Sequence, residues 1–214
     1  MKTITEQKPF EEIQGLLQRE KKVYLIGCGT CATMCHTGGS KEVLEMKQRL
    51  TEIGKEITGW MIIPTACDEL TGEALKEEHQ SVDEADAILV MTCAFGVQTV
   101  VRYNLDKPVY PALNTLFIGL EEVPAEFEER CSQCGDCLLG RTAGICPLTA
   151  CPKGLVNGPC GGYRDGKCEV DPKRDCAWVQ IYQRLKKMGR LDELYAPQPL
   201  KDYAKMGHPR RITL

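Results

Sequence analysis

The chain has 214 residues, a formal net charge of −3 and thirteen cysteines. This acidic balance argues against nucleic-acid binding, which usually requires a basic face. No apolar run approaches the roughly 18 residues of a membrane span, and the N-terminal MKTITEQKPFEEI lacks the apolar core of a secretory signal, so we expect a cytoplasmic protein with reduced thiols rather than disulfides.

Helix and strand patterns alternate through the first half of the chain. Strands are expected, in chain order, at 23–26, 57–63, 87–91 and 108–110, and helices at 10–17, 41–50, 71–84 and 96–103. Ser40 is the expected N-cap of the second helix. The expected inward faces hold Phe10, Ile13, Leu16 and Leu17, then Val43, Leu44 and Leu50, and finally Val97, Val100 and Val101. This alternation predicts an α/β fold, a small flavodoxin- or Rossmann-like parallel sheet with helices on both faces.

The charged stretch 121–126 predicts a boundary, which gives an α/β domain at 1–125, a cysteine-rich module at 126–190 and a tail at 191–214. The module is dense in Cys, Gly and Pro and buries too little apolar surface to fold alone, so bound metal must supply much of its stability. A helix closes the module, with an inward stripe of Trp178, Ile181, Tyr182 and Leu185 and a C-terminal cap at Gly189. The tail, with Pro197, Pro199 and Pro209, is expected to be extended.

Five cysteines follow the ends of predicted strands. Cys28, Cys31 and Cys35 follow the first strand, Cys67 the second and Cys93 the third. Because the carboxyl ends of parallel strands meet at one edge of a sheet, these thiols are expected to converge there. Four of them suffice for a [4Fe–4S] cluster, and the spacing leaves open which one is not a ligand. In the alternative interpretation, Cys67 and Cys93 are small buried apolar residues.

Two other interpretations of this region are weaker. The segment Gly27–Ala32 matches the G-x-G-x-x-A pattern of dinucleotide-binding loops, but two thiols have no role beside a pyrophosphate. A thiol redox enzyme using Cys28-x2-Cys31 leaves the remaining cysteines unexplained. We expect His36 and His79 to be solvent-exposed rather than ligands.

Eight further cysteines are concentrated in the module. They are Cys131, Cys134, Cys137, Cys146, Cys151, Cys160, Cys168 and Cys176. The first three have the C-x2-C-x2-C spacing of a bacterial ferredoxin, but Arg141 stands where the fourth ligand is expected. Eight thiolates can form two four-cysteine sites, which hold either two clusters or one cluster and one Zn²⁺. The spacing does not give the pairing.

The stretch from Cys131 to Leu194, with NGPCGG, GKCEV and DCAW, resembles the cysteine-rich module of methylenetetrahydrofolate reductase C-termini. The earlier GCGTCATMCHTGG and MTCAFGVQTV resemble the rest of the small MetV-type iron–sulfur subunit of that enzyme, a component of one-carbon metabolism and the Wood–Ljungdahl pathway. At 214 residues the chain is too short for the flavin-bearing TIM barrel, which takes about 250.

The resemblance implies an electron-transfer role. All thirteen cysteines are then candidate metal ligands, one of the five N-terminal thiols being left over, for two or more [4Fe–4S] clusters and, in one C-terminal set, Zn²⁺ as the alternative metal. No side chain acts as acid, base or nucleophile. Ferredoxin or another donor subunit supplies electrons, and the FMN or FAD of the partner reduces methylene-tetrahydrofolate to methyl-tetrahydrofolate. The alternative is a structural or regulatory zinc-binding subunit without electron transfer.

Overall fold

The computed structural model describes residues 2–103, 106–196 and 199–211. The chain divides into two compact units, Met1–Glu128 and Glu129–Leu214. Within the described ranges no helix combines the length and the apolar character needed to cross a membrane. All thirteen cysteines are free thiols.

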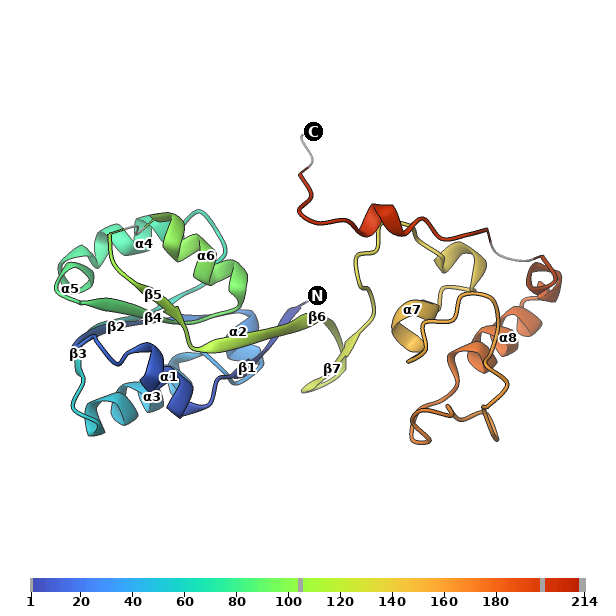
Figure 1. Cartoon of the computed structure of the whole chain (residues 1–214), viewed down its shortest axis with the longest axis horizontal. Coiled ribbons are helices and arrows are strands. Elements are labelled where there is room, and N and C mark those ends of the chain that lie inside the picture. The colour runs from blue at the N-terminus through green and yellow to red at the C-terminus, as the bar shows by residue number, and fades with distance from the viewer. Residues whose placement is uncertain (1, 104–105, 197–198, 212–214) are drawn as a thin grey trace. The chain divides into compact units, whose positions relative to one another are not determined.

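A four-stranded parallel sheet forms the centre of the first unit (Figure 1). Its order is β3-β2-β4-β5, and the strands are β2 (Lys22–Cys28), β3 (Glu56–Ile63), β4 (Ala87–Met91) and β5 (Val109–Pro111). All four strands lie where apolar runs predict them, so the predicted parallel sheet is confirmed. Cys28 pairs with Ile63, and Gly27 with Met91, so three neighbouring strands end at the same edge.

Helices cover both faces of this sheet, as predicted. Figure 1 shows α1 (Phe10–Leu16) and α3 (Ser40–Glu52) on one face, and α4 (Thr71–Glu77), α5 (His79–Asp83) and α6 (Ala94–Tyr103) on the other. Alternate strand residues enter two separate apolar layers, with Leu25 and Leu89 on the α1/α3 side and Ile26 and Val90 on the α4–α6 side. The two buried layers give this unit an apolar core of its own.

Several details of the predicted helices are wrong. Leu44 is 45% exposed because the buried stripe of α3 runs through Val43, Met46 and Leu50, and Leu44 lies one residue off it. The N-cap of this helix is Gly39, whose N–H donates to Glu42 at 2.9 Å, rather than Ser40.

Other corrections concern the remaining helices of the first unit. The predicted helix at 71–84 is two helices, α4 and α5, separated at Glu78. In α6 the buried residues are Gly96 and Val100, and Val101 is exposed one residue away on the helix surface. In α1, Leu16 is only half-buried, whereas Ile13 and Leu17 are fully buried.

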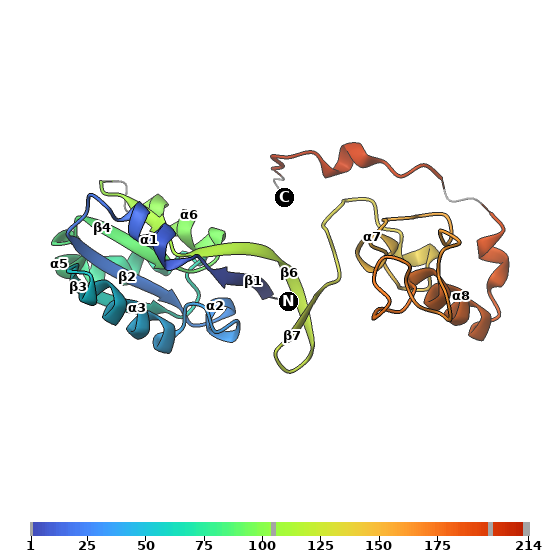
Figure 2. The ribbon, with the colours of Figure 1, turned by 60° about the horizontal axis from the view of Figure 1, so that its bottom comes forward.

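A second, antiparallel sheet was not predicted. It has the order β1-β6-β7, formed by β1 (Lys2–Gln7), β6 (Leu113–Val123) and β7 (Glu126–Glu129), and Figure 2 shows β6 running alongside β1. The charged stretch 121–126 is therefore the end of β6 and its turn into β7. The pairing joins residues more than a hundred positions apart, which no local pattern reveals.

The second unit has little regular structure. It contains η1 (Leu139–Arg141), α7 (Pro147–Ala150), α8 (Ala177–Lys187), η2 (Leu191–Leu194) and η3 (Tyr203–Met206), of which the last two lie in the tail that was predicted to be wholly extended. Its buried apolar cluster consists of Cys176, Trp178, Ile181 and Leu185. Tyr182, predicted to face inward, is exposed beside this stripe. Pro197 lies outside the described residues.

Candidate metal centres

The three neighbouring strand ends of the first unit carry four thiols. Cys28 is the last residue of β2, and Cys31 opens the short helix α2 (Cys31–Met34) directly after it. Cys93 follows β4 by two residues, and Cys67 lies in the loop that follows β3. Cys28 and Cys93 are buried, whereas Cys67 is exposed. The structure thus brings thiols from three loops to one sheet edge, as the sequence predicts.

The electrostatic environment of Cys67 includes the other three thiols of this sheet edge. The pKa of Cys67 is raised, first because partial burial disfavours its thiolate and then because of the Cys93 thiol, with smaller contributions from Cys28 and Cys31. The Sγ of Cys35 lies 3.9 Å from the backbone oxygen of Thr3 in β1. The fifth thiol therefore contacts the antiparallel sheet.

Glycines in this region serve close packing. A Cβ on Gly38 would lie 1.9 Å from the backbone oxygen of Met91, and one on Gly27 would lie 2.5 Å from that of Gly38. The loop is also tied down by a 3.0 Å bond from Cys28 N to Gly38 O. The match to a dinucleotide loop is thus explained by packing of the loop on β2 and β4. His36 and His79 are both exposed, as expected.

In the second unit, Cys131, Cys134 and Cys137 lie on an irregular turn. Gln133 and Gly135 adopt positive φ angles of 52° and 76°. The Gln133 N–H lies 3.4 Å from the Cys131 sulfur, a contact of the type that stabilises a thiolate. The Thr149 hydroxyl donates to Arg130 O at 3.2 Å. Since Thr149 is on α7, which begins directly after Cys146, this bond ties the helix that follows Cys146 to the residue that precedes Cys131.

The other four cysteines line one small cavity. It is bounded by Cys151, Cys160, Cys168 and Cys176, together with Trp178 and other side chains. Two backbone bonds hold the later pair in place, from Cys168 N to Arg174 O at 3.0 Å and from Cys176 N to Gly166 O at 2.7 Å. The eight cysteines therefore separate into a turn set, Cys131, Cys134, Cys137 and Cys146, and a cavity set, Cys151, Cys160, Cys168 and Cys176.

An ion pair flanks the cavity set. Lys153 Nζ lies 2.6 Å from Glu169, and the Cys160 thiol lies 3.2 Å from the same carboxylate oxygen. The pKa of Lys153 is raised, chiefly by its hydrogen bond to Glu169 and also by the neighbouring Cys160. A cation next to a thiol favours the thiolate that metal binding requires.

The turn set has charged neighbours that the sequence analysis missed. The side chain of Lys201 is buried, and its ammonium group donates to Asp136 O; the Cys134 thiol lies 3.6 Å from that same oxygen. Burial raises the pKa of Cys134, but hydrogen bonds from the Asp136 backbone and from Lys201 outweigh this and lower it overall. No local pattern reveals this contact, because Lys201 and Asp136 are 65 positions apart.

The candidate donor atoms of these sets are all cysteine sulfurs. Across the described ranges, no three His, Cys, Asp or Glu side chains stand close enough together to hold a metal ion in their present conformations. Each set nevertheless supplies four cysteines on shared loops or around one cavity. Thiolate-only sets of four suit Zn²⁺ or iron–sulfur clusters, and they do not suit the hard cations Mg²⁺ and Ca²⁺.

Comparison with known proteins relates the second unit to a reductase. Residues 110–204 match the sequence profile of a family described as "Methylene-tetrahydrofolate reductase C terminal". A search of curated proteins gave no match, and a search of solved structures gave none either. The match supports a relation to the methylenetetrahydrofolate reductases for the part of the chain that holds both the turn set and the cavity set.

Proposed function

We propose that the chain is the iron–sulfur electron-transfer subunit of a methylenetetrahydrofolate reductase complex in the cytoplasm. The family match to residues 110–204 supports the link to this reductase. The observation that carries the electron-transfer role is the grouping of Cys28, Cys31, Cys67 and Cys93 at one sheet edge. A zinc-stabilised C-terminal module alone does not explain these four thiols.

In the proposed complex, a one-electron donor such as ferredoxin gives up two electrons in succession. The chain relays both to the flavin of a TIM-barrel partner, where, with two protons from solvent, they reduce methylene-tetrahydrofolate to methyl-tetrahydrofolate. A [4Fe–4S] cluster, when bound, supplies one-electron transfer at each step.

The residues of the chain hold and shield the redox centres. At the sheet edge, Cys28, Cys31, Cys67 and Cys93 supply four thiolates, and the buried positions of Cys28 and Cys93 keep water from one side of the centre. Backbone N–H groups, such as that of Gln133 toward Cys131, stabilise thiolate charge at the turn set. No side chain of the chain is assigned a role as acid, base or nucleophile.

The cavity set is the part best suited to a structural zinc ion. Cys176 is buried in the apolar cluster of the second unit, and Trp178 of the same cluster also lines the cavity. Structural zinc sites are closed and four-coordinate, and they contribute directly to folding. In this second candidate arrangement, zinc in the cavity set stabilises a subunit that still transfers electrons through its other centres.

Metal analysis tests the proposal most directly. After anaerobic purification of the full chain, we expect at least four irons and matching sulfide per chain, with reducible signals in electron paramagnetic resonance. If one zinc ion per chain is found besides the iron, this supports zinc in the cavity set. Zinc without iron or sulfide contradicts the electron-transfer role.

The cysteines of the first unit provide a matched test of the sheet-edge site. Cys28→Ser, Cys67→Ser or Cys93→Ser should each lower the iron content and remove one signal, because each removes a ligand from the group of four. Cys35→Ser is the control, since this thiol faces β1 and should leave iron and spectra unchanged. If Cys35→Ser lost this signal and Cys67→Ser kept it, the proposed assignment of the four ligands would be wrong.

The partner is tested by co-purification. The proposal expects the full chain to purify from its native source with a flavoprotein of TIM-barrel size, and to transfer electrons to that flavin under stopped-flow mixing. A flavoprotein that stays oxidised when mixed with the reduced chain would argue against this partner.

A further inference from the structure

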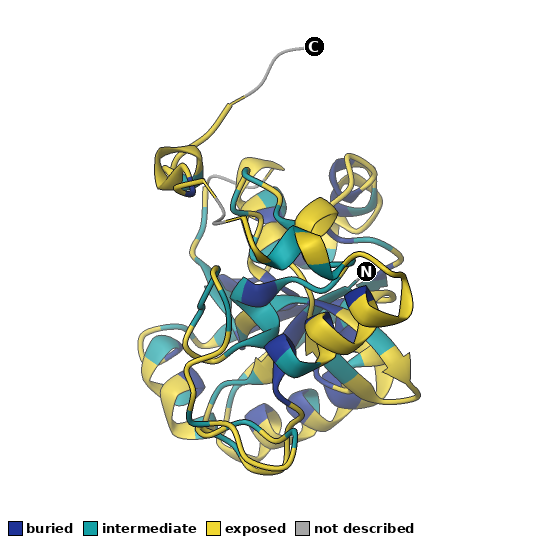
Figure 3. Cartoon of the chain, turned by 90° about the vertical axis from the view of Figure 1, so that its right-hand side faces the viewer, coloured by how far each residue is buried: buried dark blue, intermediate teal, exposed yellow. Residues whose placement is uncertain are grey.

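The C-terminal segment 199–211, here named the strap, contacts the turn that carries Cys131, Cys134 and Cys137. Nearly all of its side chains are exposed, and Figure 3 draws the described tail mainly in the exposed colour. Lys201 is the exception, at 8% exposure for the residue and 1% for its side chain. A lysine is almost never buried to this degree unless its charge has partners.

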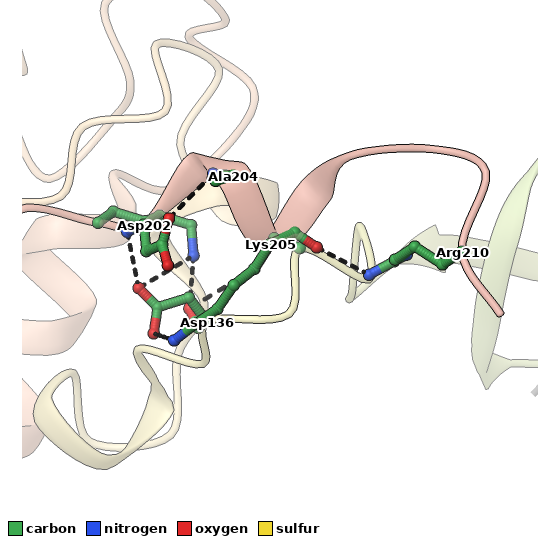
Figure 4. A network of polar contacts seen from close by, with 7 residues as sticks. Asp136, Asp202, Ala204, Lys205 and Arg210 are labelled. Carbon is green, nitrogen blue, oxygen red and sulfur yellow. Dashed lines mark hydrogen bonds and ion pairs between the residues drawn. The ribbon is translucent and has the colours of Figure 1, made fainter. Parts of the chain in front are cut away.

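Asp136, between Cys134 and Cys137, is the point to which the strap is fixed (Figure 4). Its carboxylate accepts from Asp202 N at 3.0 Å and lies 3.4 Å from the Lys205 ammonium. Its backbone oxygen accepts from the buried Lys201 ammonium. The Arg210 guanidinium donates to Gln133 O at 3.1 Å, on the other side of the same turn.

The turn is also shaped to receive the strap. Gly135 has a φ of 76°, and a Cβ at this position would lie 3.0 Å from Lys205 O and 3.1 Å from Lys205 Cβ. A side chain on Gly135 would therefore push the strap away. The close approach brings a cation to the sulfur, because the Lys201 ammonium and the Cys134 thiol both contact Asp136 O.

We infer that the strap makes Lys201 a positioning residue for electron transfer: its buried ammonium, held beside Cys134, raises the reduction potential of the centre at the turn set. This inference rests on the proposed function. One-electron reduction adds one negative charge to a thiolate-ligated centre. A fixed positive charge within a few ångströms, shielded from water, stabilises the reduced form more than the oxidised form.

The test measures reduction potentials in the full, iron-loaded chain. The relevant centre is the one whose signal disappears in Cys137→Ser. In Lys201→Met, reduction of this centre should become about tenfold less favourable, which lowers its reduction potential by about 59 mV for a one-electron couple. The iron content should stay unchanged. Lys201→Arg keeps the charge and should restore most of the potential. Lys205→Met also removes one positive charge, but the Lys205 side chain is half exposed and therefore more strongly screened by water and salt. The reduction potential of the centre should change less in this variant.

The sign of the shift separates the inference from a merely structural role. If Lys201→Met only released the strap, water would reach the centre and favour its more highly charged reduced form, which raises the potential. A raised or unchanged potential therefore overturns the inference while the electron-transfer proposal stands. If the wild-type chain carries no iron at the turn set, the proposed function fails there, and the inference fails with it.

Discussion

The first unit buries apolar side chains on both faces of a parallel sheet, whereas the second unit buries one small cluster around Cys176, Trp178, Ile181 and Leu185. The first unit has enough apolar contact to fold from its own side chains. In the second, eight cysteines lie mainly on irregular loops, and only Cys176 among them is buried. In the function proposed here, metal binding contributes to the folding free energy of this unit. The two units should therefore respond differently to the same treatments.

Metal removal should give the largest difference between the units. With a strong chelator under anaerobic conditions, we expect amide protection in α8 to fall by about 100-fold or more, because the proposed metal organises the loops of the second unit. Protection in β2 and β4 should change little, because these strands are held by the two apolar layers. Hydrogen exchange measured by mass spectrometry reports both. Equal loss in the two units would show that the first unit also depends on metal.

A mutation that creates a cavity in the apolar core of the first unit should destabilise that unit whether or not metal is bound. Leu89 in β4 is fully buried between the sheet and α1/α3. Leu89→Ala should lower the free energy of unfolding of this unit by about 2–5 kcal/mol. Urea unfolding followed by Trp60 fluorescence, a probe in β3, measures the change. Leu44→Ala, at an exposed position, is the control and should stay within about 0.5 kcal/mol.

The two tryptophans offer a smaller test, one in each unit. The Trp178 Nε1 donates to Leu155 O at 2.8 Å in the second unit. Trp178→Phe removes this donor and should destabilise the metal-loaded second unit by about 1 kcal/mol or slightly more. Hydrogen exchange of α8 measures the loss. Trp60→Phe, at an exposed position, should leave α8 unchanged. A larger effect from Trp60 would mean that the units are coupled.

The smallest expected effect is a pH dependence confined to the first unit. Backbone N–H groups of Lys22 and Lys21 donate to the Asp86 carboxylate at 2.8 and 3.0 Å and hold its pKa below the ordinary value of 3.8. A lowered folded-state pKa means that this stabilisation is complete above the ordinary value and is lost as the pH falls through the lowered one. In Asp86→Asn the free energy of unfolding should therefore depend less steeply on pH in the acid range. Urea midpoints from neutral pH to about pH 2 test this; an unchanged profile would contradict it.

Much of the first unit could be predicted because its signals are local. Apolar runs such as Ala87–Met91 located the four parallel strands, and strand ends located the cysteines that follow them. Errors occurred where one residue decides which way a helix faces, as for Leu44. The antiparallel sheet was missed, because β1 and β6 pair across most of the unit without a recognisable turn between them.

The sequence by itself determined the α/β alternation, the concentration of thiols and the family resemblance of the C-terminal half, because these depend on residue type and short-range spacing. Only the tertiary structure placed Cys35 against Thr3 of β1, and Cys151, Cys160, Cys168 and Cys176 around one cavity. It alone brought Lys201 to the turn that carries Cys134. Such contacts join residues far apart in the chain, and they form only when packing and backbone hydrogen bonds have closed the intervening loops.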